Sequence, residues 1–295
     1  MNRLNASDGD DITASSTHDD WDIRVVRRVG RLEDISLTRN PQAPLRKVGV
    51  VDVETTGVDP LHDQIIDIAY VVLEVDVYGE IVSIVRSGQG LSDPGMPIPA
   101  EITRLTGITD ADVAGKSLDL DLLQRALGEA DVLVAHNCRF DAAFLRQLLP
   151  ATANAAWVCS CRDIDWRAKA GLDGRALGHL LMNIGFFNDG HRAMADVLSL
   201  VHLLAYRLPD DRTAIGALLD AAERTTISVE ATGAPFSMRH LLKGRGYRWD
   251  PSARVWWIEV SAENCEAETL WLNREVMPHG PAPRTAAVTW RERHR

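Results

Sequence analysis

The chain has 295 residues, of which 45% are hydrophobic and 25% are charged, and its formal net charge is −10. These proportions are typical of a globular protein and exclude a disordered or fibrous chain. No run approaches the ~18 apolar residues of a membrane span, and the first residues lack the apolar core of a signal peptide, so we expect a cytoplasmic protein with no membrane partner. The acidic balance argues against coating nucleic acid by bulk attraction but leaves room for a local basic groove or a metal site.

Two segments precede the first clear strand. Residues 1–20 are rich in Asp, Ser, Thr and Asn with almost nothing to bury, which predicts a disordered acidic tail. Residues 21–46 combine a short apolar pattern with basic residues and are predicted to be a lead-in segment.

Residues 47–208 alternate between strands and helices after an opening run of strands, which predicts an α/β domain with a mixed sheet. The first three strands follow one another directly and predict an antiparallel start. The later helices have apolar residues at helical spacing. The predicted strands cover residues 47–57, 63–76, 79–89, 131–137 and 155–164, and the main helices cover 118–130, 138–150, 174–186 and 191–208.

The pattern changes after Pro209. Residues 209–224 predict a connecting helix. Residues 225–276 predict a small α+β C-terminal domain with a strand, a glycine-terminated helix and a hairpin. Residues 277–295 are expected to be a disordered tail.

Carboxylates recur at the ends of the predicted elements of the α/β domain. Asp52 and Glu54 are two residues apart in the first strand, so both point to the same face. Asp141 opens the helix after "VAHNCRF", and Asp196 lies in the helix that contains "HRAMAD". Carboxylates that converge at one place repel one another unless cations lie between them, and oxygen ligands select Mg²⁺ or Mn²⁺. Two such ions suit in-line phosphoryl displacement, which is nuclease chemistry.

Each of these residues also has a structural interpretation. A single D-x-E in a strand is often a solvated strand end, and Asp141 by itself has the position of a helix cap or first-turn acid. His191, five residues before Asp196, has the position of a solvated or capping residue. Close to Asp196, its neutral imidazole could take the proton from an attacking water, and activity would then rise with pH through the histidine titration.

Three segments in order resemble the motifs of one enzyme family. "DVETTG" (52–57), "HNCRFDAAFL" (136–145) and "HRAMAD" (191–196) are similar to the motifs of the DEDDh, or DnaQ-like, 3'–5' exonucleases. The resemblance implies an RNase H-like fold with a mixed five-stranded sheet flanked by helices, two divalent cations (Mg²⁺ or Mn²⁺), and stepwise release of nucleoside 5'-monophosphates from the 3' end of a nucleic acid. By position it implies His191 as general base and a set of metal ligands: Asp52, Glu54, Asp141 and Asp196.

The same resemblance implies contacts with the substrate. "LTGIT" (105–109) is similar to the family segment that packs on the terminal nucleotide, which makes Leu105 and Thr106 candidate contacts. Further candidates flank the 3' end or the scissile bond, and these are Thr55, Thr56, Asn137 and Phe140.

The segment 157–196 most resembles a bacterial branch described as epsilon-like subunits of the replicative polymerase. A DNA polymerase subunit is therefore a candidate partner, besides single-stranded or 3'-ended nucleic acid. No polymerase-binding peptide is recognisable, and a different C-terminal unit takes its place. This departure favours a stand-alone exonuclease for repair or nucleic-acid turnover.

The predicted C-terminal domain interleaves basic and aromatic residues, a pattern that suits single-stranded nucleic acid. The alternative is that the aromatic rings form the core of this domain and the charged side chains form its solvent-exposed face. The residues are Arg239, Lys243, Arg245, Arg248, Arg254, Tyr247, Trp249, Trp256 and Trp257. Three other functions remain open: an RNA-trimming exoribonuclease, a non-catalytic binding module, and a structural subunit recruited through this domain.

Overall fold

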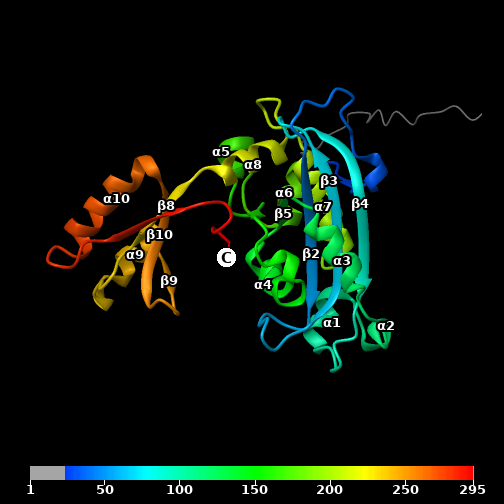
Figure 1. Ribbon diagram of the computed structural model, residues 1–295, viewed down its shortest axis with the longest axis horizontal. Helices are drawn as coiled ribbons and strands as arrows, with labels where there is room; N and C mark the ends of the chain where they lie inside the picture. The colour runs from blue at the N-terminus through cyan, green and yellow to red at the C-terminus, as the bar shows by residue number, and fades with distance from the viewer. Residues whose placement is uncertain (1–23, 295) are drawn as a thin grey trace, which may run out of the picture.

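The computed structural model describes residues 24–294, so the expected acidic tail of residues 1–20 lies outside the described part. Its larger unit is built on a mixed five-stranded sheet in the order β4-β3-β2-β5-β6 (Figure 1). Strands β2, β3 and β4 are antiparallel, whereas β5 and β6 run parallel to β2. The strands are β2 (Arg46–Thr55), β3 (Ile65–Val75), β4 (Ile81–Leu91), β5 (Val132–Ala135) and β6 (Trp157–Cys159). The expected RNase H-like α/β sheet is confirmed.

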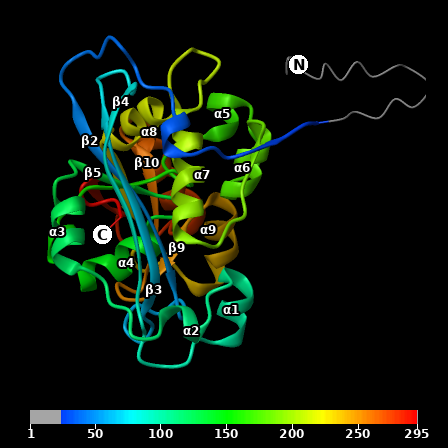
Figure 2. The same cartoon turned by 90° about the vertical axis from the view of Figure 1, so that its right-hand side faces the viewer.

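Helices cover both faces of this sheet (Figures 1 and 2). The helices of this unit are α1 (Ala100–Thr106), α2 (Asp110–Val113), α3 (Leu120–Gly128), α4 (Arg139–Leu148), α5 (Trp166–Ala170), α6 (Leu177–Asn183), α7 (Ala193–Ala205) and α8 (Ala214–Glu223). In the lead-in segment, β1 (Arg27–Arg28) pairs in parallel with β7 (Phe186–Phe187). No helix in residues 24–294 has the length and apolar character to cross a bilayer.

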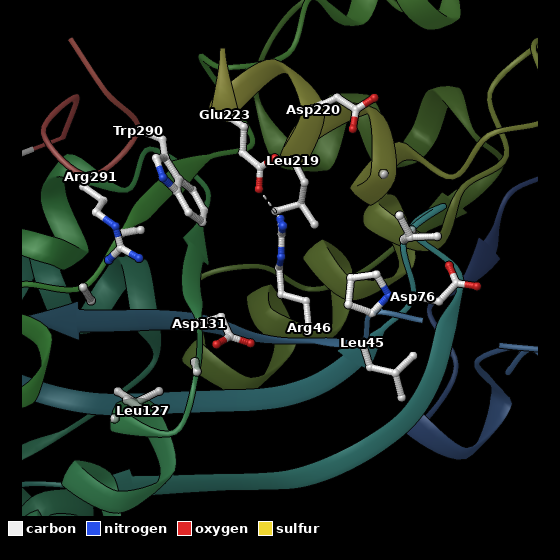
Figure 3. A pocket seen from close by; sticks show the side chains of 18 of the residues that line it. Leu45, Arg46, Asp76, Leu127, Asp131, Leu219, Asp220, Glu223, Trp290 and Arg291 are labelled. Atoms are coloured by element: carbon white, nitrogen blue, oxygen red, sulfur yellow. Dashed lines mark ion pairs between the residues drawn. The ribbon is translucent and has the colours of Figure 1, made fainter. Parts of the chain in front are cut away.

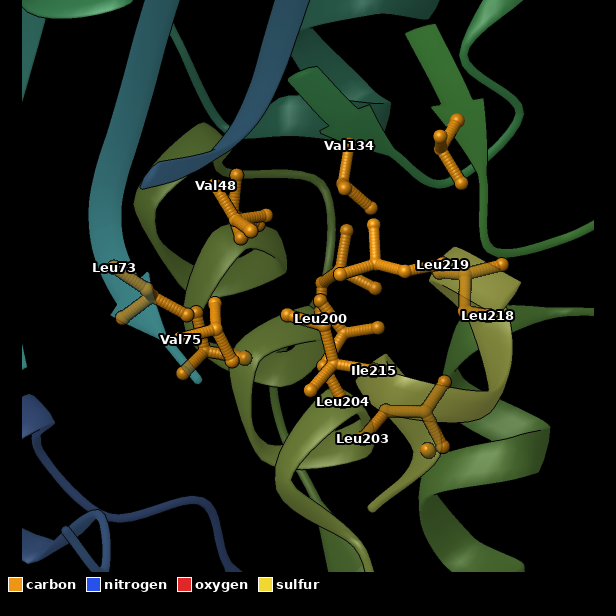
Figure 4. Packing of buried hydrophobic residues seen from close by; sticks show 14 of the residues in the cluster. Val48, Leu73, Val75, Val134, Leu200, Leu203, Leu204, Ile215, Leu218 and Leu219 are labelled. Atoms are coloured by element: carbon orange, nitrogen blue, oxygen red, sulfur yellow. The ribbon is translucent and has the colours of Figure 1, made fainter. Parts of the chain in front are cut away.

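The alternation of side chains along β2 decides where its carboxylates point. Val48 and Val50 belong to the core cluster that contains residues of α7 and α8 (Figure 4), whereas Val51 and Val53 belong to the cluster that contains residues of α3 and α4. Asp52 continues the even-numbered series, and Glu54 follows it, so both side chains lie on the α7 face. Helix α7 therefore covers the same face as the two carboxylates.

A second sheet forms the C-terminal unit, which we define as residues 226–288. Its strands are antiparallel in the order β11-β8-β10-β9. Its elements are β8 (Thr226–Glu230), α9 (Arg239–Arg245), β9 (Arg248–Asp250), β10 (Val255–Ser261), α10 (Cys265–Trp271) with a π-helical turn (Leu272–Val276), and β11 (Arg284–Val288). The unit has a buried cluster of its own, which includes Val229, Leu242, Tyr247 and Leu272.

The expectation of a disordered tail at residues 277–295 is wrong for its described part. Residues Arg284–Val288 form β11, which pairs with β8 along its whole length. The end of the chain then returns to the larger unit, where His294 is buried and contacts Asp163. The segment is poor in large apolar residues, but its backbone satisfies the open hydrogen-bonding edge of β8, which a count of apolar residues does not detect.

Candidate active site

Three carboxylates from two elements converge at the end of β2. Asp52 and Glu54 lie on the α7 face of the strand, and Asp196 lies in the first turn of α7. Each offers an oxygen atom, and these atoms all lie within 4.8 Å of one another. Strand alternation and the position of α7 thus bring together residues that are more than 140 positions apart in the sequence.

Asp141 lies next to this group without being part of it. Its side chain is buried in the first turn of α4, and its Oδ1 accepts a hydrogen bond of 3.2 Å from the backbone N–H of Val53. Val53 separates Asp52 and Glu54 in β2, so this bond fixes the carboxylate beside both of them. The structure therefore places all four predicted acids at one end of the sheet.

Burial and mutual repulsion raise the pKa of these carboxyl groups. The pKa of Asp52 lies well above its ordinary value, first because of burial and then because of Asp141 and Asp196. Burial, with Asp196 and Asp67, raises the pKa of Glu54 to about 7. Burial also raises the pKa of Asp196. Bringing these groups together as anions is therefore unfavourable without a positive charge.

This donor set fits a divalent cation. Carboxylate oxygens are the ligands that hard ions such as Mg²⁺ and Mn²⁺ prefer. Three of them lie close enough to share one ion, and a cation among them would remove the repulsion that raises their pKa values.

His191 lies just before α7, at the edge of the carboxylate group. It has a positive φ of 65°, which bends the chain so that its backbone N–H donates a hydrogen bond of 2.8 Å to Asp196 Oδ2. The side chain of His191 is exposed. Burial raises the pKa of Asp196, and the hydrogen bond from the His191 backbone and the proximity of its imidazole offset part of that rise. The imidazole of His191 is therefore accessible to water next to the Asp196 carboxylate.

A fifth acid, Asp67, was not predicted from the sequence. It is fully buried on β3. It pairs directly with Glu54 across the two strands. The amide of Gln89 donates to both of its oxygens at 3.0 and 3.1 Å, and Arg192 Nε lies 3.4 Å from Oδ2. A lone Asp inside the apolar run "IIDIA" (65–69) is a signal of the same kind as the one that identified Asp52, and it could have been used.

The four residues expected to contact the terminal nucleotide differ in exposure. The hydroxyls of Thr55 and Thr56 are both engaged in the loop after β2, where they bond to Gly57 and Asp63. Thr106 is buried and bonds within its own helical turn, whereas Leu105 at the end of α1 is 51% exposed. Of these four residues, Leu105 thus presents the most accessible side chain.

Asn137 and Phe140 lie around the start of α4. Asn137 is exposed with a positive φ of 73°, and its Oδ1 accepts a hydrogen bond of 3.5 Å from Arg162. Phe140 is half-buried and packs on Phe144 with the ring centroids 5.1 Å apart. Both residues lie close to Asp141 in the chain, four residues and one residue before it.

A cavity of about 670 Å³ lies at the opposite end of β2 (Figure 3). Arg46 at the start of the strand forms an ion pair with Glu223 there, and Trp290 stands beside them. Since Asp52 and Glu54 are near the other end of the strand, this cavity is separate from the carboxylate group.

A family model described as "Exonuclease" matches residues 50–204, more than half of the chain. The chain belongs to this exonuclease family. The match begins at β2 and ends within α7, so it includes every residue of the carboxylate group.

Two curated relatives illustrate the sequence similarity. A PolC-type DNA polymerase III from Listeria innocua is 42% identical over 98 residues, which are 32% of this chain and 6% of the relative. A PolC-type DNA polymerase III from Thermotoga maritima is 32% identical over 137 residues, which are 46% of this chain and 9% of the relative. The chain thus matches less than a tenth of the length of these relatives.

Solved exonuclease structures are also similar. Exonuclease X in complex with 5'-overhanging duplex DNA is 25% identical with a TM-score of 0.41, over 54% of this chain and 89% of that one. E. coli exonuclease I in complex with a dT13 oligonucleotide is 15% identical with a TM-score of 0.47, over 84% of this chain and 64% of that one.

Proposed function

We propose that the chain is a metal-dependent 3'–5' exonuclease of the DEDDh type that releases nucleoside 5'-monophosphates from DNA. One observation carries the proposal: in a member of the exonuclease family, the oxygens of Asp52, Glu54 and Asp196 lie within 4.8 Å of one another, with Asp141 fixed beside them. Such a group is costly to assemble unless it binds cations, and cation-assisted hydrolysis of phosphodiesters uses an arrangement of this kind.

The four carboxylates would hold two divalent cations, Mg²⁺ or Mn²⁺, which supply Lewis-acid chemistry to the scissile phosphate. The protein itself holds the carboxylates in position. Strand β2 fixes the spacing of Asp52 and Glu54, the Val53 amide fixes Asp141, and the His191 amide fixes Asp196. Because these contacts hold the carboxylates in place, the site does not have to rearrange when cations and substrate bind.

His191 acts as the general base in this proposal. Its exposed imidazole lies beside Asp196, where the neutral form can take a proton from the attacking water. Leu105, exposed at the end of α1, would pack on the terminal base, because α1 lies at the end of the sheet where β2 ends (Figure 1).

The proposed substrate and partner rest on the curated relatives. Their name is that of a DNA polymerase, which supports DNA as the substrate and a DNA polymerase subunit as a partner. The matched segment is a small part of those proteins, so a stand-alone enzyme for repair is equally compatible with the similarity.

The test is degradation of 3'- and 5'-end-labelled single-stranded DNA and RNA by the purified chain in Mg²⁺ or Mn²⁺, with EDTA and Asp52→Ala as controls. We expect the 5'-labelled DNA to shorten as a metal-dependent ladder that is absent in both controls. Faster degradation of RNA would assign the exoribonuclease function instead. If neither polymer is cleaved, the chain is a binding module and the proposal is wrong.

A further inference from the structure

A cleft of about 560 Å³ lies between the larger unit and the C-terminal unit. Arginines from both sides line it. We call it the arginine cleft and define it by Arg139, Arg162, Arg175 and Arg248. Arg139 comes from α4, Arg162 and Arg175 come from the loops on either side of α5, and Arg248 comes from β9. Segments that are far apart in the sequence therefore place positive charge on one hollow surface.

The two acids that line the cleft both contact side chains at the end of the chain. His294 Nε2 lies 2.7 Å from Asp163 Oδ2, and Arg293 Nε lies 2.6 Å from Glu259 Oε1. Within residues 24–294, none of the four arginines that define the cleft has a carboxylate within 4.0 Å. Although the chain has a net charge of −10, four guanidinium groups that form no ion pair within residues 24–294 thus lie around one cleft.

An aromatic ring, that of Trp257, lies beside the cleft and carries two of its arginines. The guanidinium of Arg248 lies 4.3 Å from the ring centroid of Trp257 and that of Arg139 lies 5.7 Å from it. Burial, together with the positive charges of Arg139 and Arg162, lowers the pKa of Arg248, so these side chains are close enough to repel one another. An anion in the cleft would relieve this repulsion.

The remaining basic and aromatic residues of the C-terminal unit do not contribute equally. Arg245 pairs with Glu268 and lies over Trp271, and the hydroxyl of Tyr247 is buried against the same carboxylate. These residues are structural. Arg248 and Trp257 are the ones that the structure joins to the arginines of the larger unit.

The arginine cleft adjoins the carboxylate group. Arg139 and Asp141 share the first turn of α4, and Arg162 donates a hydrogen bond to Asn137, just before that turn. Figure 1 shows α4 between β2 and the C-terminal unit. A strand whose 3' end lies at Asp141 would therefore reach the cleft by passing the start of this helix.

We propose that the arginine cleft binds the phosphate backbone of the single-stranded part of the substrate, upstream of the 3' end that enters the carboxylate site. The proposal rests on the proposed function and adds a second binding region to it. Guanidinium groups bind phosphate, and the Trp257 ring holds two of them, those of Arg139 and Arg248, at the cleft.

The first experiment measures binding without catalysis. Affinity of the full chain for fluorescein-labelled dT20 is followed in EDTA between 50 and 200 mM salt for wild type and for Arg175→Gln/Arg248→Gln. Each lost contact with a single strand lowers the slope of log affinity against log salt by about 0.7, so the double variant should lose about 1.4. Arg175→Gln alone, in an exposed loop where folding is not at risk, should lose about 0.7.

The matched control is Arg254→Gln/Arg274→Gln, which removes two exposed arginines of the same unit that lie outside the cleft. It should keep the wild-type slope. Equal losses in the two double variants, or an equal affinity of wild type for a 20-residue poly-glutamate, would overturn the proposal.

A second readout separates this proposal from the proposed function. If the chain is an exonuclease, kcat/KM for dT20 should fall more in the cleft variant than kcat/KM for a dinucleotide, which does not reach the cleft. Equal falls for both substrates would contradict the cleft as a binding region. If wild type cleaves neither substrate, the proposed function fails, while the binding experiment in EDTA still decides the role of the cleft.

Discussion

Glu54 and Asp67 lie directly opposite each other on the antiparallel strands β2 and β3, so two carboxylates face each other next to the candidate metal ligands. Arg192 and Gln89 hold Asp67, and Asp67 in turn raises the pKa of Glu54. Asp67 therefore affects the ionisation of Glu54 without belonging to the group of three clustered carboxylates. Arg192, one residue after His191, links the same acid to the start of α7.

We expect Asp67→Asn to reduce activity without abolishing it. The amide keeps the size of the side chain but removes a negative charge beside the proposed ligands and breaks the ion pair with Arg192, so a cation is attracted less strongly. Changes next to metal ligands typically cost about 10–100-fold in metal affinity or activity. The measurement is kcat against Mg²⁺ concentration, where the midpoint should shift to higher Mg²⁺. An unchanged midpoint would mean that Asp67 only fills space.

The metal-free protein should become less stable as the pH rises. The folded-state pKa of Glu54 is raised from 4.5 to about 7, so the folded protein holds this proton more tightly than the unfolded chain does. Its contribution is fully present below pH 4.5 and is lost as the pH rises through about 7. Thermal unfolding in EDTA between pH 5 and 8 should show a falling Tm.

Glu54→Gln should flatten this dependence, because the amide does not titrate. Glu101→Gln, at an exposed position of α1, is the matched control and should leave it unchanged. Adding Mg²⁺ should raise the Tm of wild type more at pH 8 than at pH 5, since binding requires the ionised carboxylates. A Tm in EDTA that rises with pH and is insensitive to Glu54→Gln would contradict the buried-charge account.

Asp52→Asn should separate stability from activity. Activity should fall by more than about 100-fold, because even outer partners of a metal ligand cost 10–100-fold. The Tm in EDTA should rise, by about 2–4 °C for each kcal/mol of repulsion that is relieved. Asp121→Asn, at an exposed position of α3, should change neither quantity. Full activity of the Asp52 variant would reject the metal assignment.

His191→Ala should lower kcat by about 10²–10⁴-fold, the usual contribution of a general base, with little change in KM or in metal affinity. The dependence of activity on pH should also weaken in this variant, because the proposed proton acceptor is removed. His279→Ala, an exposed histidine of the C-terminal unit, should behave as wild type. A retained pH profile in the His191 variant would assign the proton transfer to another group.

The sheet and its carboxylates were predictable because their signals are local. Asp52 and Glu54 share a face through strand alternation alone, whereas Asp196 was assigned through the resemblance of "HRAMAD" to a motif of the exonuclease family. The confirmed α/β sheet rests on the same periodicities. The roles of the site residues stay predictions until the variants are measured.

Other features depend on contacts that no local pattern contains. The Asp67 carboxylate is held by hydrogen bonds from Gln89 and Arg192, which are 22 and 125 positions away in the sequence. Strand β11 forms because β8 offers an open edge to a segment that is poor in large apolar residues. The arginine cleft joins side chains from four separate segments, and only the folded chain brings them together.

The ion pair of Arg293 with Glu259 should be the most sensitive contact of the C-terminal segment. Their side chains are only 7% and 14% exposed, and Arg293 also donates to the backbone carbonyls of Ala222 and Arg224, so it ties the chain end to the connection between the two units. Breaking a buried pair by removing one partner typically costs about 3–5 kcal/mol.

We therefore expect Arg293→Gln to lower the free energy of unfolding by about 3–5 kcal/mol in urea titrations. Arg28→Gln is the matched control, because its ion pair with Asp189 is exposed and should contribute at most about 1 kcal/mol. If the two variants unfold at the same urea concentration, the end of the chain does not fasten the C-terminal unit to the larger one.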